Sequence, residues 1–179
     1  MAIESIRTIL EKKFPELLKK WLDSIEGSYP EGATELLKDK EDRFRNPAVH
    51  RIADNAAEIL TELLNGSNPN NFVKPLDGII RLRAVQDLTP SNAVGFLFGL
   101  KEIIRSALPG DWTGESRLGE LRELEDRIDA LLLLSFDIYE SCRLQVFELR
   151  MNEMRRISGF NRPGERAEEN RKSDQTNNP

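Results

Sequence analysis

Hydrophobic residues recur three and four positions apart along most of the chain, the period of amphipathic α-helices. The first segment with this pattern is 1–26, and Pro15 lies among its apolar positions. An interior proline removes a backbone donor and clashes with the preceding turn. We therefore expect a kink, or two helices with Pro15 in the first turn of the second. Glycine and proline residues then interrupt the pattern, and a short helix is expected at 33–40.

Proline, asparagine and glycine mark the borders of the next helix. Asn46 can accept free amide hydrogen bonds at a helix start, and Pro47 is pre-organised for the first helical position. The helical period then continues over 47–64. Asn65-Gly66 should end this helix, since glycine tolerates the left-handed exit conformation. A polar loop is expected at 67–71.

Two further helices are expected before residue 110. The fourth covers 72–87, and the fifth begins with Thr89 as its cap and Pro90 at its first position. The fifth helix is apolar on nearly all sides, which predicts a central position covered by other helices. It contains Gly95 and Gly99, four residues apart, and this pair should permit the close approach of another helix.

The last helical pattern is the longest, from 115 to 157. It predicts one helix of about forty residues, roughly 60 Å long, or two nearly collinear ones. A small domain cannot cover that length, so part of it should project from the domain or pair with a second subunit. The apolar side chains expected at this interface are Leu131, Leu132, Ile138 and Val146.

The apolar pattern ends after Ile157, and 158–179 is polar and charged. Such a segment cannot bury enough surface to offset its ordering entropy, so it is predicted to be a disordered tail. The period-two alternation of strands is absent throughout. The sequence therefore predicts an all-α helical domain over 1–157, with a long C-terminal helix, followed by the tail.

Composition narrows the classes of function. The 179 residues are 39% hydrophobic and 32% charged, which provides for a core and a solvated surface. The net charge of −5 argues against a general nucleic-acid binder. No apolar run approaches the roughly 20 residues of a membrane span, and the N-terminus lacks a signal pattern. We expect a cytoplasmic protein without membrane insertion.

Few residues suggest chemistry. Cys142 is the only cysteine and His50 the only histidine, so a multi-ligand thiolate or histidine-pair metal site is not expected. Cys142 is interpreted as a buried small hydrophobe. His50 is interpreted as a residue at the boundary between core and surface. The alternative is a haem ligand, because haem needs only one axial ligand from the protein. No nucleophile–base set is found, so we expect no enzyme and no cofactor.

A polar group precedes the Thr89 helix start and consists of Arg81, Arg83, Gln86 and Asp87. Arg83 and Asp87 are four apart and could form an ion pair on one helix face. This group could lock the turn. Alternatively, it could line a pocket for an anion or a signal molecule, since helix N-termini favour negative charge.

The chain also carries short motifs in a fixed order. These are Trp21, Tyr29-Pro30, the segment Lys40–Pro47 and the segment Ile80–Ser91. In this order they resemble the N-terminal sensor domain of stressosome co-antagonist proteins of the RsbR and RsbRD type, over about residues 5–150. The resemblance implies a non-haem, globin-like, dimeric signal-input domain in stress-response signal transduction.

In full-length relatives a long final helix leads into a STAS domain, which meets the partner kinase. Here a polar tail follows that helix, so we expect a stand-alone sensor-domain protein whose partner is supplied in trans. In haem globins the proximal histidine lies in the second half of the fold, which counts against His50 as a haem ligand. Three functions remain open: a sensor of a small molecule or protein, a haem sensor using His50, and a helical adaptor of a larger complex.

Overall fold

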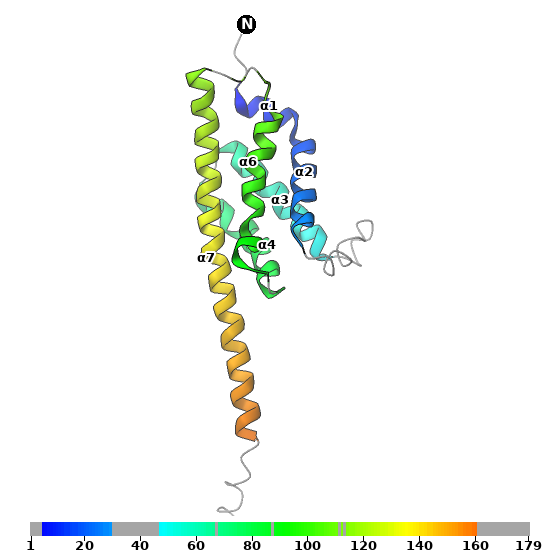
Figure 1. The fold of residues 1–179 in the computed structure, drawn as a ribbon, viewed down its shortest axis with the longest axis vertical. Coiled ribbons are helices and arrows are strands. Elements are labelled where there is room, and N and C mark those ends of the chain that lie inside the picture. The colour runs from blue at the N-terminus through cyan, green and yellow to red at the C-terminus, as the bar shows by residue number, and fades with distance from the viewer. Residues whose placement is uncertain are drawn as a thin grey trace, which may run out of the picture. The chain divides into compact units, whose positions relative to one another are not determined.

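The computed structural model describes residues 5–29, 47–66, 68–86, 88–110, 112 and 114–160. Its elements are α1 (Ile6–Lys12), α2 (Phe14–Gly27), α3 (Pro47–Asn65), the 3₁₀ turn η2 (Pro69–Phe72), α4 (Val73–Val85), α5 (Pro90–Val94), α6 (Phe96–Ala107) and α7 (Glu115–Phe160). No strand occurs in these ranges. The predicted fold class, all-α with a long C-terminal helix, is confirmed (Figure 1). The helix predicted at 33–40 and the cap at Asn46 lie outside the described residues.

Pro15 separates two helices rather than bending one. Lys13 lies between α1 and α2, and Pro15 falls in the first turn of α2. The amide that proline lacks has no intrahelical acceptor at that position, so the residue is tolerated there. The second of the two sequence-based alternatives for this region is therefore confirmed.

The segment between α3 and α4 is more regular than predicted. Gly66 has a φ of 66°, as expected for a glycine that ends a helix. The loop predicted at 67–71 contains the first residues of η2, because the Asn68 side chain accepts a 2.9 Å hydrogen bond from the Asn70 amide. The helix predicted at 72–87 begins at Val73 and ends at Val85.

The apolar helix after Thr89 is split. The Thr89 hydroxyl accepts from the Asn92 amide at 3.4 Å, and Pro90 is the first helical residue, as predicted. At Gly95, however, the chain passes from α5 into α6. A Cβ at Gly95 would lie 2.5 Å from the Ser91 carbonyl oxygen, so this junction requires glycine. The prediction of a single helix here was therefore wrong, and α6 also leaves one apolar side chain uncovered, since Phe98 is 57% exposed.

Helices α2 and α6 pack closely against each other. A Cβ at Gly99 would lie only 3.0 Å from the Ser24 hydroxyl of α2, which confirms the close approach predicted there. The indole of Trp21 is fully buried, donates to the Phe96 carbonyl at 3.0 Å and stacks on the Phe96 ring. This contact joins α2 to the first turn of α6.

Helix α7 is one continuous helix of 46 residues, which decides between the two alternatives left by the sequence. The chain divides into two units, Met1–Cys142 and Arg143–Pro179. In the first unit α7 contributes buried side chains to the core: Leu124, Ile128, Leu131, Tyr139 and Cys142. In the second unit no described side chain of 143–158 is buried.

Helix α7 extends beyond Ile157, the residue at which the helical pattern was predicted to end. Helix α7 continues through Phe160, because backbone hydrogen bonds within a helix do not require an apolar side chain at each position. The remainder of the predicted tail, 161–179, lies outside the described residues. The division into a domain and a disordered tail therefore stays a prediction.

Candidate functional site

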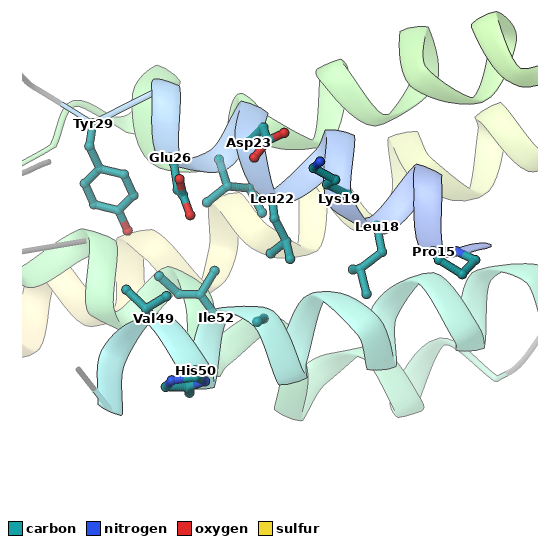
Figure 2. Close-up of a pocket in the computed structure, with 12 residues that line it drawn as sticks. Pro15, Leu18, Lys19, Leu22, Asp23, Glu26, Tyr29, Val49, His50 and Ile52 are labelled. Carbon is teal, nitrogen blue, oxygen red and sulfur yellow. The ribbon is translucent and has the colours of Figure 1, made fainter. Parts of the chain in front are cut away.

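A cavity of about 410 Å³ lies between α2 and α3. Figure 2 shows side chains from the two helices pointing toward each other across it. Its apolar lining consists of Leu18, Leu22 and Ile25 of α2 and Val49, Ile52 and Ala53 of α3. Residues three or four positions apart share one face of a helix, so each trio forms one wall. Lys19 and Asp23 are exposed at the rim.

Two buried polar atoms belong to residues that line this cavity. The Tyr29 hydroxyl and Nε2 of His50 are both buried and have no hydrogen-bond partner. A buried polar group without a partner costs free energy that a ligand or an ordered water can offset. The size and the apolar lining give the cavity the character of a binding site for a small molecule.

Arg83 lies behind Tyr29 and is 0% exposed. Its Nη2 donates to the Ser28 hydroxyl and to the Asn92 carbonyl, each at 2.7 Å. Nε and Nη1 have no acceptor. The guanidinium carbon lies 4.5 Å from the centre of the Tyr29 ring and 5.4 Å from that of Phe96. The guanidinium is therefore held between two aromatic faces at the joint of α2, α4 and α5.

Burial shifts the ionisation of this pair. It lowers the pKa of Arg83, whose charged form loses its hydration, while the neighbouring Tyr29 opposes this shift. Burial raises the pKa of Tyr29, with Arg83 again opposing. Among the described residues no carboxylate forms an ion pair with Arg83. Within the described part of the chain, the site thus holds a buried cationic group without a countercharge.

The structure separates the polar group predicted before Thr89. Arg81 is exposed and pairs with Asp77 one turn earlier at 3.0 Å, whereas Arg83 is buried. Gln86 is exposed at the end of α4. Asp87 and its predicted ion pair with Arg83 lie outside the described residues. The sequence did not reveal Ser28, Tyr29 and Asn92 as neighbours of Arg83, because Ser28 and Arg83 are 55 positions apart and no local spacing links them.

The apolar positions proposed for the dimer interface differ in accessibility. Leu131 is 4% exposed within its own core, and Leu132 and Ile138 pack partly against that core. Val146, in the second unit, is partly exposed. The most exposed large apolar side chains of α7 within the first unit are instead Leu133 (68%), Leu118 and Phe136.

Other candidate chemistry is limited among the described residues. Cys142 is a free, buried thiol, as expected, and burial raises its pKa. The described residues contain no group of three or more histidine, cysteine or acidic side chains arranged to hold a metal ion. None of the described helices combines the length and apolarity needed to cross a bilayer.

Comparison with known proteins identifies one family. The model of the RsbT co-antagonist protein rsbRD N-terminal domain matches residues 15–154. This range includes both walls of the cavity and Arg83. No curated protein and no solved structure matches the chain.

Proposed function

Because the chain belongs to the family of RsbT co-antagonist rsbRD N-terminal domains, we propose that it is a non-enzymatic signal-input domain that binds a small apolar molecule between α2 and α3. The family is a regulatory one by its description. The observation that carries the proposal is the apolar cavity of about 410 Å³, whose lining residues include buried polar atoms without partners. Its size and apolar lining are typical of small-molecule sites.

The output of such a domain would pass through α7. The Tyr139 hydroxyl of this helix donates to the Leu88 carbonyl at 2.6 Å, in the segment that precedes α5. Arg83 holds the Asn92 carbonyl in the same α5 segment and also contacts Tyr29 at the cavity. If the contacts among α2, α4 and α5 have two conformations, a ligand that binds them with different affinity would shift their populations. Helix α7 would then transmit this change in conformation.

The ligand claim is tested by thermal unfolding with a panel of metabolites and apolar compounds. A ligand at 100 times its Kd should stabilise the native state by about 2.7 kcal/mol, or a Tm rise of roughly 5–10 °C at this size. Ala53→Leu should fill the cavity and abolish the shift. Ala57→Leu, one turn further along α3 and outside the lining, is the matched control. A shift that survives Ala53→Leu would contradict binding at this site.

A protein partner, supplied in trans, and a homodimer are the further parts of the proposal. The family description names a co-antagonist of RsbT, which supports action through protein contacts. The exposed apolar residues of α7, such as Leu133 and Phe136, support self-association. If the chain acted only as an adaptor, a stable partner would be captured and no small molecule would change the Tm.

One observation favours a haem-binding alternative strongly enough to test. His50 lines the cavity, and its Nε2 is buried without a hydrogen-bond partner. Haem added to the purified protein should then give a Soret band that His50→Ala removes. The absence of a band with the unaltered chain, or one unchanged by the substitution, would exclude this alternative.

A further inference from the structure

The inference begins from the unmet hydrogen-bonding capacity of Arg83. Its side chain is fully buried, yet Nε and Nη1 donate to nothing, and no described carboxylate pairs with it. The two rings beside it and the two acceptors of Nη2 stabilise the cation only in part. An anion that accepted from Nε or Nη1 would supply both the missing charge and a charge-assisted hydrogen bond.

Tyr29 both contacts this guanidinium and lines the cavity. Its ring covers the guanidinium at 4.5 Å, and the same residue closes one end of the α2–α3 cavity (Figure 2). Rotation of the side chain gives up the contact of the ring with the guanidinium, and a charge-assisted hydrogen bond from Arg83 to a bound anion would replace it. The Tyr29 amide would keep its hydrogen bond to the Glu26 carbonyl during this rotation. The movement would open a path from the apolar cavity to Nε and Nη1.

We propose that the cavity takes an amphipathic monoanion. The apolar body lies between α2 and α3, and the anionic head, a carboxylate in the simplest case, accepts from Nε or Nη1 of Arg83 once the Tyr29 ring has turned aside. A single negative charge on the head matches the single positive charge of the Arg83 guanidinium. This inference rests on the proposed function and names the ligand class for the same cavity.

The test compares decanoate with decanol, which share an apolar body and differ in the charge of the head. Kd values are measured by calorimetry below the micellar concentration. Decanoate should bind the unaltered protein at least about tenfold more tightly than decanol, the size of one hydrogen bond to a charged group. In Arg83→Gln this ratio should fall to about one, while decanol binding is retained. The matched control is Arg81→Gln, an exposed arginine on the same helix, which should leave the ratio unchanged.

A second variant keeps the test decisive if Arg83→Gln does not fold. Tyr29→Ala removes the covering ring, so it should raise the preference for decanoate over decanol further. A ratio near one in the unaltered protein, or one that Arg83→Gln and Tyr29→Ala leave unchanged, overturns the anion inference while ligand binding in the cavity stands. Failure of both compounds to bind overturns the inference too. A positive metabolite screen that Ala53→Leu abolishes would show that the proposed function nevertheless survives.

Discussion

The two tyrosines of this chain provide a sharp test of its buried hydrogen bonding. Both are 6% exposed, but their hydroxyls differ. Tyr139 donates to the Leu88 carbonyl at 2.6 Å, whereas the Tyr29 hydroxyl has no partner. Replacing either residue with phenylalanine removes one oxygen and keeps the ring, so packing changes little and the hydrogen bond dominates the difference.

The magnitudes follow from what each substitution leaves behind. Tyr139→Phe leaves the Leu88 carbonyl buried without its donor, which costs about 1–3 kcal/mol. At this chain length that lowers the Tm by roughly 2–12 °C. Tyr29→Phe removes a buried hydroxyl that bonds to nothing, so the free energy of unfolding should stay within about 0.5 kcal/mol or rise.

Urea unfolding followed by circular dichroism measures both variants against the unaltered chain. The midpoint should fall for Tyr139→Phe at an unchanged slope m, since the surface exposed on unfolding is the same. An equal loss in both variants, or a larger loss for Tyr29→Phe, would refute the assignment of these hydroxyls. It would also remove the link between α7 and the segment before α5 on which the proposed output depends.

Three further predictions concern the core and α7. Leu131→Glu should unfold the domain, as measured by circular dichroism, because the Leu131 side chain is 4% exposed. Leu133→Glu should leave the fold intact and should lower the mass of the proposed homodimer in light scattering. An intact fold in both variants would contradict the orientation of α7. Trp21→Phe should reduce the free energy of unfolding, measured by urea titration, by about 2 kcal/mol or more. The smaller ring leaves a cavity and removes the indole N–H that donates to the Phe96 carbonyl. A loss below about 0.5 kcal/mol would contradict that packing. Cys142 should react with a thiol reagent at neutral pH no faster than the local unfolding that exposes it, because burial raises its pKa and blocks access. Labelling at the rate of the urea-unfolded chain would instead show that the thiol is exposed in the folded protein.

The borders of several helices could be predicted because their determinants are local. Pro15, the Thr89-Pro90 start and the Gly66 exit each act through backbone atoms within a few residues. The split at Gly95 was missed because it depends on how closely the backbone can turn against Ser91, and an apolar run does not report that distance. For the same reason the helical period alone predicted one longer helix there.

The face of α7 illustrates a limit of periodicity. Leu131, Leu132 and Leu133 are adjacent in an apolar run, and the sequence offers no means to rank them. Packing against the core buries the first and leaves the third exposed, because successive helical residues point about 100° apart. The interface predicted from the run therefore mixed core residues with exposed ones.

By itself the sequence determined the all-α class, the long final helix and the family, because helical period, caps and motif order are properties of neighbouring residues. Only the tertiary structure decided that Arg83 meets Tyr29, Ser28 and Asn92, and that two helix faces enclose an apolar cavity. Arg81 and Arg83 look alike in the chain, yet one lies in solvent and the other in the core. The physical reason is that burial, and with it the energetic cost of an unpaired charge, depends on contacts between segments far apart in sequence.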